Sequence, residues 1–368
     1  MKKVLFVATV VQKHINVFHI PYLKMFQEEG YKTYVAAAND TDDQNVKIQY
    51  CDEYVEIEFK RNPLHPKNFS AYRKLRKLIQ NNDFDIIHCH TPVGGLLGRL
   101  AARNARKKGT RVFYTAHGFH FYKGAPLKNW LFFYPVEKFC SYFTDVLITI
   151  NQEDYALAHK KMKAKRVEYV PGVGIDLSRF KNVQVDRAAK RREIGVPEDA
   201  FLLFSVGELN ANKNHQVIIK ALAKLNNPSV HYAIAGIGDK REYLLNLAAE
   251  LGIAEQVHLL GYRKDIPELN CSADVFCFPS FREGLSVSLI EVMACGLPVV
   301  CSRIRGNTDL ITSDGGCLFD PYDVMDCWHA ITSIRDGDMS RMSEVNIENS
   351  LCYSTNKIIT EMKNIYEL

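Results

Sequence analysis

The segment PSFREGLSVSLIEVMACGLPVV, residues 279–300, decides the fold class of this chain. It follows the apolar run VFCF (275–278), passes through a polar loop into a largely apolar segment, and reaches a second apolar run through Gly296-Leu297-Pro298. This order predicts a strand, a loop, a helix, a turn and another strand. Because both apolar runs are short and continuous, we expect buried parallel strands with the helix covering their sheet.

The same alternation extends through the rest of the second half. Helical spacing occurs around residues 217–225 and 243–251. Short apolar runs before and after these segments are expected to form the strands: FLLFSVG (201–207), HYAIAG (231–236), VHLLG (257–261), VFCFPS (275–280) and PVVCS (298–302). The pattern predicts a parallel sheet wound with helices.

The first half repeats this organisation. Helices are expected over residues 19–29 and 69–80. The run YVEIEF alternates apolar and charged residues, which suits an edge strand. The expected strands are KVLFVATV (3–10), KTYVAAA (32–38), YVEIEF (54–59), DIIHCH (85–90), RVFYTAH (111–117) and DVLITI (145–150).

The segment VPGVG (170–174) breaks the alternation and marks a domain boundary. We expect one Rossmann-like domain over residues 1–172 and a second over 173–350. A helix within 351–368 is expected to return to the first domain. Ligands bind beyond the carboxyl ends of the strands in open parallel sheets, so functional residues are expected in the loops that follow strands.

Composition agrees with two globular domains, since the 368 residues are 47% hydrophobic and 24% charged. Lys2 and Lys3 lead straight into an apolar strand without a small-residue cleavage site, so we expect no export signal. No apolar run approaches the roughly 20 residues that span a bilayer. The ten cysteines show neither CxxC pairs nor zinc-ligand spacing. The expectation is a cytoplasmic protein with free thiols.

The net charge of +5 is unevenly distributed. Residues 1–172 carry 27 Lys and Arg against 16 Asp and Glu, a net charge of +11, whereas residues 173–368 carry −6. The first half is therefore expected to meet an anionic partner. No nucleic-acid motif is present. One interpretation is a peripheral contact with an anionic membrane through the basic helix at 69–80 and the run WLFFY (130–134). The other is a solvated basic face and an aromatic run that belongs to the core.

Two glutamates in the segment 279–300 are the strongest candidates for functional residues. Glu283 falls in the predicted loop and Glu291 in the predicted helix. The free N–H groups of Gly284, Leu285 and Ser286 at the helix start would form an anion site. Carboxylates beside a phosphate site are suited to accept hydrogen bonds from sugar and ribose hydroxyls. The alternative is that an acidic residue near a helix N-terminus only complements the helix dipole.

The whole string, PS-x-x-EG-x-S-x-x-x-x-E-x-M-A-x-G-x-P-V-V, resembles the signature of the family 4 retaining glycosyltransferases. The resemblance covers nearly the whole chain and is strongest to enzymes that build bacterial capsular, exopolysaccharide and O-antigen chains. It implies the GT-B fold, an α/β architecture of two Rossmann-like domains with a cleft between them. It also implies that Glu283 contacts the donor sugar and Glu291 the nucleotide ribose.

The implied reaction moves a hexose or N-acetylhexosamine from a nucleoside-diphosphate sugar to a glycan or a polyprenyl-diphosphate-linked acceptor. UDP is the expected nucleotide, and neither a tightly bound cofactor nor a catalytic metal is expected. Two further functions stay open: a GT-B sugar-nucleotide epimerase, which acts on the donor alone, and a non-catalytic subunit that binds the sugar nucleotide.

The segment SVGELNANKNHQ (205–216) resembles the family's phosphate-binding loop. The resemblance assigns Lys213 to the donor diphosphate. Glu208 stands where the family usually has an arginine, which removes one positive charge. Arg282 and Arg305 are the candidates to replace it.

The segment IAGIGDKREYL (234–244) resembles the family's glycine loop, in which Gly236 and Gly238 would let the backbone approach the nucleotide. A lone G-x-G is also common in ordinary turns. Arg241 replaces the last glycine of the dinucleotide fingerprint, which disfavours a nicotinamide-dependent dehydrogenase. Tyr262 and Arg263 are the candidates for the base pocket.

In the first domain, TAHGFHFY (115–122) resembles the family's His-Gly motif, which assigns His117 to the donor sugar and phosphate. We expect no such contact from His120. The first loop, ATVVQKHINVFH (8–19), lacks the family's Gly-Gly, so Thr9, His14 and His19 are candidates to contribute instead.

The pair His88 and His90 has metal-ligand residue types. Since no third ligand is evident from the sequence, packing is the expected role of this segment.

Overall fold

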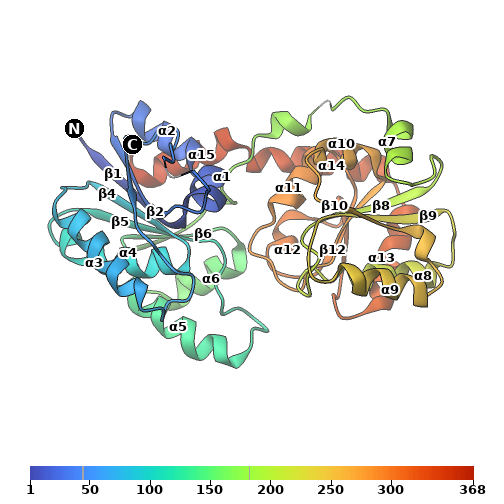
Figure 1. Cartoon of the computed structure of the whole chain (residues 1–368), viewed down its shortest axis with the longest axis horizontal. Helices are drawn as coiled ribbons and strands as arrows, with labels where there is room; N and C mark the ends of the chain where they lie inside the picture. Colours follow the sequence, from blue (N-terminus) through green and yellow to red (C-terminus); the bar gives the residue numbers. More distant parts are fainter. Residues whose placement is uncertain (44, 182) are drawn as a thin grey trace. The chain divides into compact units, whose positions relative to one another are not determined.

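The computed structural model describes residues 1–43, 45–181 and 183–368, which form two compact units (Figure 1). Unit 1 consists of Met1–Gly174 together with Thr355–Leu368, and unit 2 consists of Ile175–Ser354. The chain thus leaves unit 1 once and returns to it for its last helix.

Unit 1 is a doubly wound parallel sheet. Its order is β3-β2-β1-β4-β5-β6-β7, and each of these neighbours pairs in parallel. The winding direction reverses between β1 and β4, which is the topological switch point where such sheets bind ligands. The strands are β1 (Lys3–Val10), β2 (Lys32–Ala38), β3 (Glu53–Glu56), β4 (Ile86–His90), β5 (Arg111–Ala116), β6 (Val146–Thr149) and β7 (Arg166–Tyr169).

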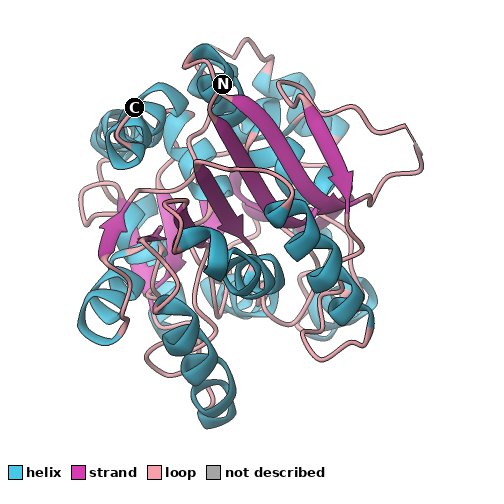
Figure 2. Cartoon of the chain, turned by 90° about the vertical axis from the view of Figure 1, so that its left-hand side faces the viewer, coloured by secondary structure: helices cyan, strands magenta, loops and turns pink. Residues whose placement is uncertain are grey.

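Helices cover both faces of this sheet (Figure 2). The central strand β1 is apolar on both faces, so each face needs a layer of helices. Alternate β1 residues enter two different cores: Val4 and Phe6 pack on the face of α2 and α15, whereas Leu5 and Val7 pack on the face of α3 and α4. The helical segments are η1 (Val11–Ile15), α1 (Asn16–Phe18), α2 (Ile20–Glu28), α3 (Lys67–Gln80), α4 (Pro92–Arg106), α5 (Leu127–Ser141), α6 (Gln152–Lys161) and α15 (Thr355–Tyr366).

Unit 2 repeats the design with the order β10-β9-β8-β11-β12-β13, again in parallel. Its switch point lies between β8 and β11. The strands are β8 (Phe201–Val206), β9 (Val230–Ala235), β10 (Val257–Gly261), β11 (Val275–Phe278), β12 (Val299–Ser302) and β13 (Gly316–Phe319). The helices are α7 (Arg187–Glu193), α8 (His215–Leu225), α9 (Arg241–Glu250), α10 (Ile266–Ser272), α11 (Val287–Ala294), α12 (Asn307–Leu310), α13 (Val324–Arg335) and α14 (Met339–Ser350), with short 3-10 turns at Leu177–Phe180, Ala254–Gln256 and Leu351–Tyr353.

The strands expected from the sequence are all present, and β3 occupies the predicted edge position. Two strands were missed, β7 and β13, and both are four-residue strands at the edge of their sheets. An edge strand pairs with a neighbouring strand on one side only and is less enclosed than a central strand. A short edge strand therefore needs no continuous apolar run. Within the described residues, the helices are too short or too polar to cross a bilayer.

Candidate functional site

Two candidate residues of unit 2, Lys213 and Glu283, lie in loops at its switch point. Lys213 lies in the loop that leads from β8 to α8, and Glu283 in the loop that leads from β11 to α11. Since β8 and β11 are neighbours, these two loops leave the same end of the sheet side by side.

Lys213 and Glu283 form an ion pair. The Lys213 Nζ donates to Glu283 Oε1 at 2.9 Å, and both side chains are about four-fifths buried, with 21% and 18% exposed. The ammonium also lies over the Phe278 ring, 4.6 Å from its centroid, and the Lys213 backbone N–H donates to Asn210 Oδ1. A cation and a carboxylate are therefore held together at the place where the fold family binds ligands.

The backbone around Glu283 is tightly supported. Arg305 Nε donates to the Glu283 carbonyl oxygen at 3.2 Å, and Arg305 itself is buried. Gly306 has a positive φ of 79° and lies so close to Gly284 that a Cβ would overlap the Gly284 carbonyl oxygen. Of the two arginines proposed to compensate for Glu208, Arg305 contacts the loop with its side chain, which bonds to the Glu283 backbone. Arg282 and Glu208 are exposed.

The helix α11 begins at Val287 and is capped by Ser286, whose Oγ accepts from the Leu289 N–H at 3.3 Å. Gly284 and Leu285 therefore belong to the loop ahead of the helix rather than to its first turn. The first-turn N–H groups, where an anion is favoured, start one residue after Ser286. Glu291 is partly buried on this helix, and burial raises its pKa, an effect that Arg179 partly offsets.

The packing of the loop after β9 requires glycine at positions 236 and 238. A Cβ at Gly236 would overlap the Gly207 carbonyl oxygen, and one at Gly238 would overlap the Leu209 backbone. The Leu209 N–H donates to the Ile237 carbonyl oxygen at 3.0 Å, so the two loops are bonded as well as close. These glycines thus allow the loops after β8 and β9 to lie against each other.

The two base-pocket candidates differ in their surroundings. Tyr262 is 71% exposed. Arg263 bonds to Asp265, with its Nε donating to Oδ1 at 2.8 Å, and it also pairs with Glu193. Hydrogen bonds to these two carboxylates raise the pKa of Arg263.

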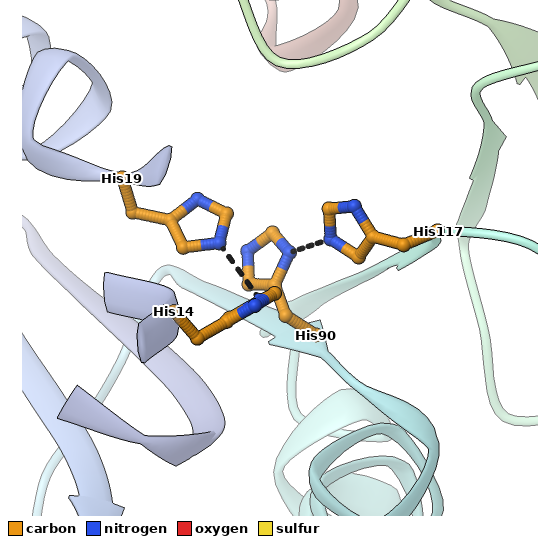
Figure 3. Close-up of side chains that lie close together, drawn as sticks. All are labelled: His14, His19, His90 and His117. Atoms are coloured by element: carbon orange, nitrogen blue, oxygen red, sulfur yellow. Dashed lines mark hydrogen bonds between the residues drawn. The ribbon is translucent and has the colours of Figure 1, made fainter. Parts of the chain in front are cut away.

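Unit 1 holds the second group of candidates, a histidine cluster of His14, His19, His90 and His117 (Figure 3). His14 lies on the π-helical turn after β1, and His19 immediately precedes α2. His90 ends β4 and His117 follows β5. Three segments of the chain, the one after β1, the end of β4 and the one after β5, thus meet beyond the carboxyl ends of neighbouring strands.

The imidazole nitrogens of the histidine cluster point toward one another. His14 Nε2 and His19 Nε2 are 3.1 Å apart, and His117 Nε2 and His90 Nδ1 are 3.4 Å apart. One nitrogen of each ring lies within 4.8 Å of the others. Burial lowers the pKa of all four histidines, to about 4 for His14 and about 3 for His117. The four rings are therefore neutral at pH 7.

His88 and His120 are outside the histidine cluster, although the His88 ring lies against that of His90, with 4.0 Å between the centroids. His88 is buried, and its two nitrogens bond to Tyr366 Oη and, at 2.8 Å, to Thr115 Oγ1. This agrees with the packing role that was expected. The ring of His120 stacks on Phe133 at 4.6 Å.

No third ligand-type residue beside the His88 and His90 pair was evident from the sequence. In the structure three further imidazoles surround His90, from the first loop and from the His-Gly motif. Their meeting was missed because spacing along the chain does not show which loops meet at a switch point. The useful signal was the position of His14 and His19 after β1 and of His117 after β5, because β1, β4 and β5 are neighbours.

Two family models match the chain. The model described as Glycosyl transferase 4-like matches residues 3–151, and the model described as Glycosyl transferases group 1 matches residues 186–349. The first match lies in unit 1 and the second in unit 2.

Proteins of similar sequence are also glycosyltransferases by name. EpsD of Bacillus subtilis (strain 168), a glycosyltransferase by name, is 44% identical over 314 residues, which cover 84% of this chain and 81% of the relative. A protein of Escherichia coli, named UDP-Gal:alpha-D-GlcNAc-diphosphoundecaprenol alpha-1,3-galactosyltransferase, is 28% identical over 82% of this chain and 79% of its own length.

Solved structures show the same fold. Anabaena HepE, crystallised with UDP and glucose, matches with a TM-score of 0.80 at 19% identity over all of both chains. WaaG, a glycosyltransferase involved in lipopolysaccharide biosynthesis, matches with a TM-score of 0.73 at 18% identity over 98% of this chain and 99% of its own. With two parallel-sheet units, matches to both family models and a relative at 44% identity, the chain belongs to the GT-B glycosyltransferases of the capsular and exopolysaccharide type.

Proposed function

We propose that the chain is a retaining glycosyltransferase that moves a hexose or N-acetylhexosamine from a UDP-sugar to a lipid-linked acceptor in surface polysaccharide synthesis. The name of the Escherichia coli relative supports both a UDP-sugar donor and an undecaprenyl-diphosphate acceptor. The UDP and glucose in the HepE crystal support the donor class.

The observation that carries this proposal is the Lys213–Glu283 ion pair at the unit 2 switch point. Without donor, the ammonium and the carboxylate neutralise each other. A donor diphosphate carries more negative charge than one carboxylate, so it takes over Lys213 as its partner. Glu283 is then free to accept hydrogen bonds from hydroxyls of the sugar.

The proposed reaction is a front-face substitution through an oxocarbenium-like transition state. The bond from the anomeric carbon to the diphosphate oxygen breaks, the bond to the acceptor oxygen forms on the same face, and the acceptor proton passes to the departing diphosphate. The protein positions the reactants and stabilises the leaving group's charge. Lys213 and the start of α11 serve the diphosphate, and the contact of His117 with the donor sugar stays a prediction of the family resemblance.

The nucleoside is assigned to unit 2 as well. Glu291 accepts from the ribose hydroxyls as a carboxylate, and the exposed Tyr262 ring offers a stacking surface for the base. Arg263 is held by Asp265 and Glu193, so its contribution to the base pocket requires exchange of these partners.

We further propose that unit 1 contacts an anionic membrane through α5. Several large apolar side chains of this helix and its end are exposed: Leu127, Leu131, Phe132, Val136, Phe139 and Tyr142. From the aromatic run WLFFY, in contrast, Trp130, Phe133 and Tyr134 pack against the core. An exposed apolar helix within a unit of net positive charge suits the surface of an anionic bilayer, where a lipid-linked acceptor resides.

The test is a donor screen with the purified chain and a membrane lipid extract. UDP-glucose, UDP-galactose, UDP-GlcNAc, UDP-GalNAc and GDP-mannose are supplied separately, and the released nucleotide is measured. We expect UDP release from one donor, and loss of release in Glu283→Ala and Lys213→Ala. NMR of the product then gives its anomeric configuration. An inverted product would refute retention, and unchanged rates in both variants would refute the assignment of the site.

A second candidate, a non-catalytic subunit that binds the sugar nucleotide, is favoured by one observation. Glu208 is exposed in the loop where the family usually places an arginine, and its carboxylate accepts a hydrogen bond from Asn210 Nδ2 at 2.9 Å. Binding of a UDP-sugar by calorimetry, without UDP release in the presence of the lipid extract, would support this candidate over the transferase.

A further inference from the structure

The histidine cluster of unit 1 has features that sugar transfer does not require. We propose that His14, His19, His90 and His117 bind one divalent cation of the borderline transition-metal class, with Zn²⁺ as its representative, through one imidazole nitrogen each.

The spacing of the nitrogens suits such an ion. With Zn–N bonds of about 2.0–2.1 Å in a tetrahedral site, two ligand nitrogens lie about 3.3 Å apart. The 3.1 Å separation of His14 Nε2 from His19 Nε2 and the 3.4 Å separation of His90 Nδ1 from His117 Nε2 bracket this value. One nitrogen of each ring lies within 4.8 Å of the others, so the four surround a volume of the size that one ion needs.

The donor set selects the class of metal. Four imidazoles suit zinc, copper, nickel and cobalt, whereas magnesium and calcium prefer oxygen ligands. A neutral imidazole offers the lone pair of one ring nitrogen to a metal, so each of the four side chains can supply one ligand.

A second observation concerns the other nitrogens of two of these rings. His19 Nδ1 and His90 Nε2 are buried, and neither has a hydrogen-bond partner in the part of the chain that the structure describes. A small cavity lies against them, with His19, His88, His90 and His117 in its wall. Buried polar atoms are rarely left unsatisfied. Because His19 Nε2 and His90 Nδ1 face the proposed ion, water in the adjoining cavity would bond to these two remaining nitrogens.

Packing alone does not account for the arrangement. The Phe6 ring stacks on His90 at 5.7 Å with an interplanar angle of 9°, which any aromatic ring at position 90 would allow. Packing does not explain why one nitrogen from each of four rings faces the same small volume. Buried polar atoms are normally distributed among separate partners rather than gathered together.

Co²⁺ and Zn²⁺ are the probes for this proposal. The tag-free full-length chain is stripped with a chelator, equilibrated with either ion and desalted, and bound metal is measured by mass spectrometry. We expect a single tightly held ion per chain and the visible d–d bands of tetrahedral Co²⁺. A thiolate-to-Co²⁺ charge-transfer band should be absent, which separates the histidine cluster from the ten cysteines.

His14→Gln is the main variant because His14 is partly exposed, and His90→Gln is the second. Each should bind Co²⁺ at least about tenfold more weakly, since even an outer-shell partner of a metal ligand is worth that much. His159→Gln is the matched control, an exposed histidine of unit 1 outside the cluster, and should bind normally. Circular dichroism establishes that each variant is folded.

Equal metal content and equal spectra in the wild type, His14→Gln and His159→Gln would overturn the proposal, as would a wild type that retains no ion. The readouts are metal content and absorption, so they are independent of sugar transfer. A chain that binds the ion but transfers no sugar would uphold the site and refute the proposed function.

Discussion

At the scale of single residues, the Lys213–Glu283 pair connects sequence, geometry and chemistry. A cation held by one carboxylate before the donor arrives is already positioned for a phosphate, so little reorganisation is needed when the diphosphate replaces the carboxylate. The pair also explains how Glu283 can lie near a phosphate site without repelling the donor. Its charge is balanced until the donor hydroxyls arrive.

The first prediction concerns this pair. Lys213→Ala should lower kcat by about 100- to 1000-fold, the usual effect of removing one preorganised donor to a charged transition state. Lys224→Ala is the matched control, because Lys224 is exposed at the other end of α8. Rates come from UDP release under saturating donor. A loss of less than about fivefold would argue against a role for Lys213 in catalysis.

The second prediction concerns a pair of thiols in unit 2. A hydrogen bond with Cys295 lowers the pKa of Cys271 to about 7, while the pKa of Cys295 is raised. The thiolate is the reactive form, so alkylation of Cys271 should accelerate as the pH rises through about 7. Peptide mass spectrometry after brief iodoacetamide treatment measures this midpoint.

In Cys295→Ala the hydrogen bond is lost, and the midpoint for Cys271 should move to higher pH. The exposed Cys352 is the internal reference, because it lies outside this pair and its labelling should be the same in both proteins. An unchanged midpoint for Cys271 would show that Cys295 does not stabilise its thiolate.

At the scale of elements, the loops show what a sequence can and cannot predict. The order of strands and helices followed from apolar runs of four to eight residues, because a buried parallel strand has to be apolar on both faces. The same reasoning placed Lys213 and Glu283 in loops after strands. It could not predict that they form an ion pair, which depends on β8 and β11 being neighbours in the sheet.

The turn after β1 shows the limit more clearly. Residues Val11–Ile15 form a π-helical turn, which no apolar pattern distinguishes from an α-helix. This turn and the segment before α2 bring His14 and His19 to the ends of β4 and β5. Sequence reasoning named both histidines as substitutes for missing glycines, but their meeting with His90 required the order of the sheet.

The third prediction belongs to α5. Replacing both Leu131 and Phe132 by Asp should weaken binding to phosphatidylglycerol vesicles by at least about tenfold, because two exposed apolar side chains lose their burial in the bilayer. Co-sedimentation with liposomes measures the effect. Leu245→Asp is the matched control, an exposed leucine on α9 of unit 2. Equal sedimentation of wild type and the double variant would contradict a membrane role for α5.

At the scale of the whole molecule, the chain builds unit 1 from two separated pieces. The last helix, α15, belongs to unit 1 and buries Ile358, Met362 and Tyr366 against α2 and the sheet. The Tyr366 hydroxyl bonds to His88 Nδ1, so the C-terminal helix supports the strand that carries His90. Unit 1 is therefore complete only when the last residues of the chain have folded.

The fourth prediction tests that dependence. Tyr366→Phe should lower the free energy of unfolding of unit 1 by about 1–3 kcal/mol, because it leaves His88 Nδ1 buried without its partner. The chain has two tryptophans, Trp130 in unit 1 and Trp328 in unit 2. In a Trp328→Phe background, urea unfolding followed by fluorescence therefore reports on unit 1.

The complementary Trp130→Phe background reports on unit 2, where Tyr366→Phe should leave the midpoint unchanged. Tyr322→Phe controls for loss of a tyrosine hydroxyl, since Tyr322 is 80% exposed in unit 2. A shift of the Trp130 signal alone would show that α15 stabilises only the unit it returns to. Equal shifts in both backgrounds would instead mean that the two units unfold as one cooperative body, so that a mutation in one unit lowers the stability of both.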